Sequence, residues 1–149
     1  MMDMKDMNQL YDLEEALRDI SSAMICLQGY NEYEEWFDVI ARVADVLNKM
    51  ETRLAAMFDE EPELIEIPKF RRFGWGEVAE KAADVESAMI SVENAVDNLK
   101  EHALFRDAAE VLDDVYFELK MEYDALEDEA AREAARELEA LTREYYSMV

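Results

Sequence analysis

The sequence predicts an all-α protein, an antiparallel helical bundle of about four helices (two helical hairpins) with a long C-terminal helix. Along four stretches of the chain, apolar residues recur in alternating steps of three and four, which is typical of one face of a helix. Only three glycines and two prolines interrupt the 149 residues, and a hydrophobic content of 51% argues against disorder. We expect residues 1–149 to form a single helical-bundle domain, because a chain of this length buries roughly two thirds of its surface.

The first predicted hairpin covers residues 10–57. Its first helix has a strict heptad of Leu10, Leu13, Leu17, Ile20, Met24 and Leu27. Gly29 follows, and glycine suits the left-handed C-terminal cap of a helix. Asn31 and Glu34 have the spacing of a capping box, which predicts that the second helix begins there after a very short turn. Two helices joined so tightly are expected to be antiparallel neighbours.

The second helix has the longest unbroken stripe, formed by Tyr33, Trp36, Ile40, Val43, Leu47, Met50, Leu54 and Met57. Phe37, Val39, Ala44 and Val46 widen this stripe beyond the contact face of a two-stranded coil. We therefore expect the second helix to be covered by more than one neighbour and to lie at the centre of the bundle.

Residues 58–76 form the one long connection, because both prolines and two glycines interrupt the pattern there. The segment is too apolar for a free linker, so we expect it to pack across the bundle. Its apolar residues are Leu64, Ile65, Ile67, Phe70, Phe73 and Trp75. A third helix then follows from Val78, and its stripe would continue onto Arg106, Glu110 and Asp113, which cannot be core. The chain must therefore turn between about Asn98 and Arg106.

The last helix is predicted from about Asp107 to Tyr146. Its roughly 40 residues would span about 60 Å at 1.5 Å per residue. Its last third must overhang, bend back or meet a second subunit. The segment 22–25, Ser-Ala-Met-Ile, recurs at 87–90, and Phe37 and Val43 fall opposite Phe105 and Val111 after a three-residue slip, so a duplicated hairpin is a further hypothesis.

The balance of 15 basic and 38 acidic side chains gives a net charge of −23. Such a surface repels nucleic acid and anionic membranes and attracts basic surfaces. No stretch has the length and hydropathy of a transmembrane helix or a signal sequence, and the single cysteine, Cys26, fits a reducing compartment. We expect a cytoplasmic protein that binds neither nucleic acid nor membrane directly.

No motif in the sequence fixes a reaction, and we predict a non-enzyme with no cofactor and no metal. The single histidine, His102, excludes a carboxylate-bridged diiron site, and we interpret it as a cap or surface residue. One alternative remains, because residues 34–38 (EEWFD) and 110–113 (EVLD) resemble the magnesium-binding elements of the all-α nucleoside triphosphate pyrophosphohydrolases. Their separation in this chain is far longer than in that family.

The last helix carries a row of like charges, Glu110, Asp114, Glu118 and Glu122. At i, i+4 each such pair costs a few tenths of a kcal/mol, so local stability does not explain the row. Phe117 and Met121 fall on the same side of this helix, and an apolar pair with a charged rim is typical of an interaction hot spot. We predict that these six residues bind a partner. The alternative is that the apolar pair is buried by the 58–76 connection or by a second copy.

Spread along a bundle of about 40 to 60 Å, the charge of −23 comes within about a factor of two of the linear charge density of duplex DNA. In size, helical character and charge, the chain resembles the acidic nucleic-acid-mimic inhibitors that phages use against restriction and CRISPR enzymes. That resemblance implies a non-enzymatic inhibitor that blocks a basic, nucleic-acid-handling protein. The alternatives are a structural or adaptor protein that forms a homodimer through the C-terminal helix, and the pyrophosphohydrolase.

Overall fold

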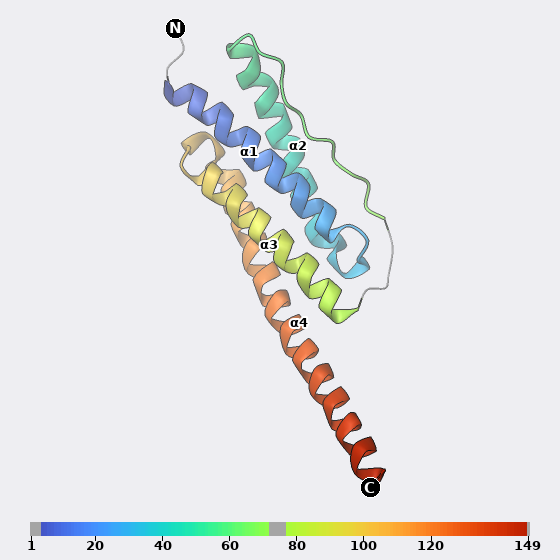
Figure 1. Cartoon of the computed structure of the whole chain (residues 1–149). Coiled ribbons are helices and arrows are strands. Elements are labelled where there is room, and N and C mark those ends of the chain that lie inside the picture. Colours follow the sequence, from blue (N-terminus) through green and yellow to red (C-terminus); the bar gives the residue numbers. More distant parts are fainter. Residues whose placement is uncertain (1–3, 72–76, 149) are drawn as a thin grey trace.

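The structure is a computed structural model that describes residues 4–71 and 77–148, and within these ranges it contains helices and no strand. Its four α-helices are α1 (Met4–Leu27), α2 (Glu34–Met57), α3 (Val78–Lys100) and α4 (Arg106–Ser147). Short 3-10 helices, η1 (Asn31–Tyr33) and η2 (Ala103–Phe105), join α1 to α2 and α3 to α4 (Figure 1). The all-α class, the two hairpins and the long C-terminal helix are confirmed.

The centre of the bundle is α1 packed against α3, not α2 as the sequence suggested. Helix α3 lies against both α1 and α4, whereas α2 packs mainly on α1 and only lightly on α4. The physical reason is that α1 buries a second row of small residues, Ala16 and Ala23, beside its heptad, which allows a close approach. The stripe on α2 is also shorter than predicted, because Met57 is 70% exposed and Phe58 is buried in its place.

Both hairpin turns contain a short 3-10 helix, but only the first also contains a residue with a positive φ, since Glu101 at the end of α3 has a φ of −70°. Gly29 has a φ of 106°, so its predicted left-handed conformation is confirmed. The predicted capping box is wrong, because Asn31 lies inside η1 and the N-cap of α2 is Tyr33, without a side-chain hydrogen bond. Instead, the Tyr33 N–H donates to the Tyr30 carbonyl (3.0 Å) and the Tyr33 ring is buried. The second turn lies within the predicted interval, since α3 ends at Lys100.

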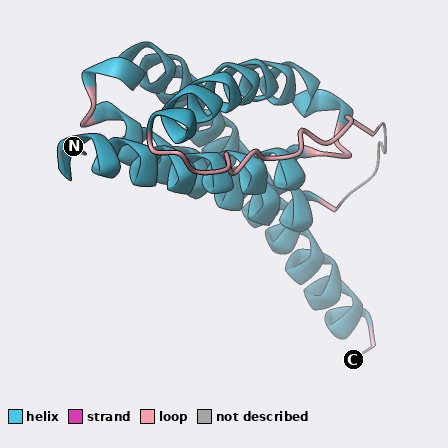
Figure 2. Ribbon diagram, turned by 90° about the horizontal axis from the view of Figure 1, so that it is seen from above, coloured by secondary structure: helices cyan, strands magenta, loops and turns pink. Residues whose placement is uncertain are grey.

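The long connection follows the α1–α2 face along the length of the bundle and is not a free linker (Figures 1 and 2). The Asn48 side chain both donates to the Ile65 carbonyl and accepts from the Ile65 N–H. The Gln28 amide donates to the Lys69 carbonyl at 2.8 Å. Ile65, Ile67 and Phe70 pack against the core as expected, while Leu64 is exposed. Phe73 and Trp75 lie outside the described residues.

The two hairpins are repeats, related by an offset of 72 residues and not by the offsets of 65 and 68 that the short sequence matches suggested. Adding 72 to the number of a buried α1 residue gives a buried α3 residue, except that Leu17 corresponds to the half-buried Met89. The residues that precede η1 and η2 also match: Tyr30 has φ −107° and ψ 114°, and His102 has φ −113° and ψ 122°. Counterparts buried in α2–η1 and α4–η2 are Tyr33/Phe105, Phe37/Ala109, Ile40/Leu112, Val43/Val115, Leu47/Leu119 and Leu54/Leu126.

Two reciprocal hydrogen bonds show that an approximate twofold axis relates the hairpins. The Tyr30 hydroxyl donates to the Asp84 carboxylate. In the counterpart positions, His102 Nε2 lies 2.6 Å from Asp12 Oδ2. In each bond a residue of one repeat contacts a residue of the other, and the counterparts of the two residues make the same contact with the repeats exchanged. Such reciprocal contacts define a twofold relation. His102 therefore stands at the N-cap of η2 but is not a surface residue, because Asp12 holds its half-buried ring against the bundle.

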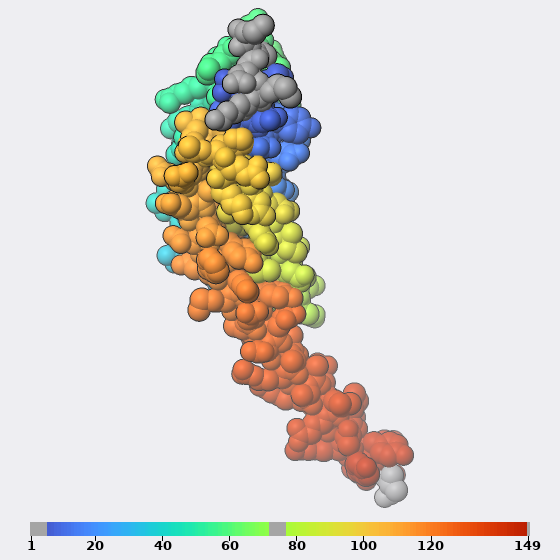
Figure 3. Space-filling model, turned by 90° about the vertical axis from the view of Figure 1, so that its left-hand side faces the viewer, coloured from blue at the N-terminus to red at the C-terminus, as the bar shows by residue number. Residues whose placement is uncertain are grey.

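The last third of α4 overhangs the bundle, one of the three outcomes left open by the sequence (Figures 1 and 3). Leu126 is the last buried residue of the helix. Beyond it, Leu138, Leu141 and Tyr145 are 63–68% exposed, although they continue the stripe that packs on α3 nearer the start of α4.

Candidate protein-binding surface

Four of the six predicted partner-binding residues lie on the outward face of α4. Successive residues of a helix are turned by about 100°, which puts Glu110, Asp114, Phe117 and Met121 opposite the buried stripe centred on Leu112. All four are exposed, with Phe117 at 54% and Met121 at 73%. The described part of the connection, up to residue 71, lies on the α1–α2 side of the bundle and does not cover them. The structure therefore leaves an apolar pair and two carboxylates together on an open face.

The other two predicted residues, Glu118 and Glu122, turn from this face toward α2. Glu118 Oε2 accepts a hydrogen bond of 2.7 Å from the Trp36 indole Nε1. Burial raises the pKa of the Tyr33 hydroxyl, and the charge of Glu122 raises it further. The expectation of an unpartnered row thus fails at Glu118, because the sequence does not reveal that α2 supplies a donor there.

Glu110 and Asp114 form no ion pair with any described residue. Acidic residues elsewhere do have cationic partners, among them Glu139 with Arg143 (2.8 Å) on the overhang. At least one carboxylate of the overhang thus has its charge compensated within the same helix. The row on the first half of α4 keeps an uncompensated negative charge beside exposed apolar surface.

The two elements that resemble a magnesium site do not bring their described carboxylates into a metal-binding group. The Trp36–Glu118 contact brings the start of α2 beside the middle of α4. Glu110 lies two turns, about 12 Å, from Glu118 toward the start of α4. Within the described ranges, no group of three or more His, Cys, Asp or Glu residues could hold a metal ion. Cys26 is half-buried, and burial raises the pKa of its thiol, which disfavours the nucleophilic thiolate.

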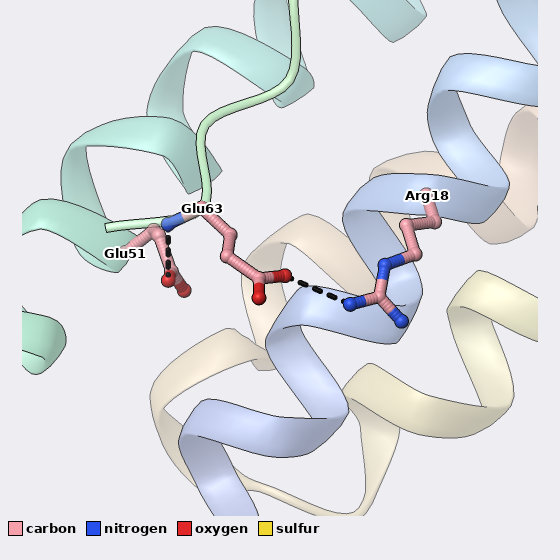
Figure 4. Close-up of polar contacts among 3 residues, drawn as sticks. All are labelled: Arg18, Glu51 and Glu63. Atoms are coloured by element: carbon pink, nitrogen blue, oxygen red, sulfur yellow. Dashed lines mark hydrogen bonds and ion pairs between the residues drawn. The ribbon is translucent and has the colours of Figure 1, made fainter. Parts of the chain in front are cut away.

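A buried carboxyl group, which sequence reasoning missed, lies where the connection meets α2. Glu51 is fully buried, and its Oε1 accepts a hydrogen bond of 3.1 Å from the Glu63 N–H. The Glu63 side chain pairs with Arg18 on α1 at 2.8 Å (Figure 4). The pKa of Glu51 is raised to about 7, mainly by burial; the hydrogen bond from the Glu63 N–H lowers this pKa, and the neighbouring Glu14 carboxyl raises it.

The sequence does contain a signal for this group, because Glu51 falls four residues after Leu47 and three before Leu54, on the buried stripe of α2. Its counterpart in the second hairpin is Tyr123, whose hydroxyl donates to Glu127 at 2.6 Å. A protonated Glu51 would likewise be a donor, and Glu51 Oε2 has no partner among the described residues. The group stabilises the attachment of the connection and lies far from the outward face of α4.

The geometry of the outward face can be compared with no known site. No protein family model, no curated protein and no solved structure matches this chain. Among the described residues, no helix is long and apolar enough to cross a membrane.

Proposed function

We propose that this protein is a non-enzymatic acidic inhibitor that binds a basic, nucleic-acid-handling protein and blocks its nucleic-acid site. One observation carries the proposal: the outward face of α4 combines exposed Phe117 and Met121 with Glu110 and Asp114, which have no cationic partner in the described chain. Exposed aromatic and methionine side chains with a charged rim suit the centre of a protein interface. Lysine and arginine from a partner would relieve the repulsion along the row.

The total charge supports a partner that ordinarily holds nucleic acid. The 42 residues of α4 span about 63 Å, and a charge of −23 along that length is a substantial fraction of the charge density of a duplex. A basic groove would therefore attract this protein in competition with its own ligand. In this proposal the protein acts in the cytoplasm, where it inhibits an enzyme of the restriction or CRISPR type on behalf of a phage.

The test is capture of proteins from a nuclease-treated bacterial lysate on the immobilised chain, with elution by duplex DNA or RNA. The double variant Glu110→Lys/Asp114→Lys should retain at least tenfold less of the nucleic-acid-eluted protein. Glu133→Lys/Glu137→Lys is the matched control, because it changes the net charge equally on the overhang and should capture as wild type. Equal loss in both variants would mean that net charge alone attracts the partner, and no loss would remove the proposed face.

The overhang favours self-association as a second candidate function. Its first half is lined by small residues, Ala130 and Ala134, and its second half by Leu138, Leu141 and Tyr145. In an antiparallel pair of overhangs, large side chains of one copy would meet small ones of the other. Sedimentation should then show a homodimer through the C-terminal helix that Leu138→Glu/Leu141→Glu abolishes; a monomer at millimolar concentration would exclude it.

A further inference from the structure

An open apolar groove lies between α2 and the first half of α4, on the side where these two helices pack only lightly. Its volume is about 390 Å³. Its apolar lining comes from Val39, Val43, Val46 and Met50 on α2, from Leu104 on η2, and from Ala108 and Val111 on α4. Two charged side chains, Arg42 and Asp107, complete the lining. Val46, Leu104 and Val111 are each 41–51% exposed, so a substantial apolar surface remains uncovered here.

The approximate twofold axis shows what the groove lacks. The counterpart of Ala108 in the first hairpin, 72 residues earlier, is Trp36. The Trp36 ring is stacked on Tyr33, with centroids 5.4 Å apart, and fills the space between α2 and α4. At the equivalent position the second hairpin has only the methyl group of Ala108. The groove is therefore the position of a large aromatic ring that one repeat supplies and the other does not.

The polar surroundings of the two positions differ in a way that selects the occupant. The Trp36 indole donates to Glu118, and the counterpart of Glu118 beside the groove is Val46. A ring in the groove thus meets no acceptor from this position, which suits a phenyl group because it has no polar atom to satisfy. On the α4 wall, Asp107 lines the groove, and Asp114 lies one turn beyond Val111 on the same side of the helix.

We propose that the groove receives a phenylalanine side chain of the basic partner, from a segment that has lysine or arginine beside this residue. The inference rests on the proposed function, because Asp114 belongs both to the rim of the groove and to the outward face of α4. The ring would be the buried anchor of the interface, and the flanking cations would meet Asp107 and Asp114. A volume of about 390 Å³ has room for one such side chain.

Two synthetic peptides serve as probes: a pentapeptide with a central phenylalanine between pairs of lysines, and the same peptide with alanine at the centre. Fluorescence anisotropy at moderate salt measures the affinity of each. We expect the phenylalanine peptide to bind about tenfold more tightly, the contribution of a largely buried aromatic side chain. Equal affinities for the wild-type protein would overturn the inference.

The variant Ala108→Trp reproduces the first repeat in the second and should fill the groove. It should remove the preference for phenylalanine, whereas Ala131→Trp on the exposed overhang should keep it. Persistence of the preference in Ala108→Trp would also overturn the inference. If that variant does not fold, Val46→Gln, a change at a half-exposed site, should weaken only the phenylalanine peptide.

The two proposals fail separately. In one outcome, Ala108→Trp removes the preference for phenylalanine, but Glu110→Lys/Asp114→Lys does not change the capture of protein from the lysate. That outcome would support the groove as a binding site and refute the charged face. Charge-dependent capture without a preference for phenylalanine would refute the groove alone.

Discussion

Replacement of the buried Glu51 by glutamine should stabilise the protein at neutral and alkaline pH. Glutamine has nearly the same shape, its Oε1 can still accept from the Glu63 N–H, and its amide can donate to Glu14. The wild-type carboxyl group has a pKa raised from 4.5 to about 7 by burial. Above pH 7 the wild-type protein must therefore hold an ionised carboxylate in the core, whereas the variant holds a neutral amide.

The magnitude follows from the linkage between pKa and stability. A group whose pKa is raised on folding keeps its full contribution below the unfolded pKa and loses it as the pH rises through the folded pKa. For Glu51 the loss occurs between pH 4.5 and about 7, and at about 1.4 kcal/mol per pKa unit it amounts to about 3 kcal/mol. For a chain of this size, that corresponds to roughly 6 to 12 °C in Tm.

Urea denaturation followed by circular dichroism at several pH values measures the effect. The free energies of unfolding of wild type and Glu51→Gln should differ by about 3 kcal/mol at pH 8, with the difference shrinking as the pH falls toward 4.5. Glu60→Gln, in the exposed part of the connection, is the control and should follow the wild type. A Glu51→Gln protein that is less stable than wild type at pH 8, or a difference independent of pH, would refute the assignment of a neutral Glu51.

Two further predictions concern the repeat and the overhang. His102→Ala and its counterpart Tyr30→Phe should each lower the free energy of unfolding by about 1 to 3 kcal/mol, because each leaves a half-buried carboxylate without its donor; chemical denaturation of both variants checks this, and losses under about 0.3 kcal/mol would contradict it. Removal of residues 132–149 should change the stability by less than about 1 kcal/mol, since no residue described there is buried. A large loss in the same assay would mean that the overhang is packed in solution.

The helices could be predicted from sequence because their apolar periodicity is local. The turn near His102 was predictable without glycine or proline, since the α3 stripe runs onto charged residues there. The outward exposure of Glu110, Asp114, Phe117 and Met121 also follows from helical geometry, and their role in binding stays a prediction. The hydrogen bond from Trp36 to Glu118 could not be predicted, because it joins residues 82 positions apart through the packing of α2 on α4.

The repeat was the least accessible feature of the sequence. Its true register preserves burial, but the paired residues range from identical, as in Leu47 and Leu119, to very different in size, as in Phe37 and Ala109. Identical tetrapeptides therefore pointed to an offset of 65, which the buried positions contradict. The place of Glu51 on the α2 stripe indicates its burial, but its hydrogen-bond partner could not be predicted, because the Glu63 N–H comes from an irregular connection.

A single chain that contains two related hairpins can do something that a symmetric pair of separate hairpins cannot. In a homodimer, one gene would dictate tryptophan at both equivalent positions or at neither. Covalent fusion removes that constraint, so Trp36 can complete one half of the molecule while Ala108 leaves the other half open. The broken symmetry confines the open groove to one place on a scaffold that is built from two related halves.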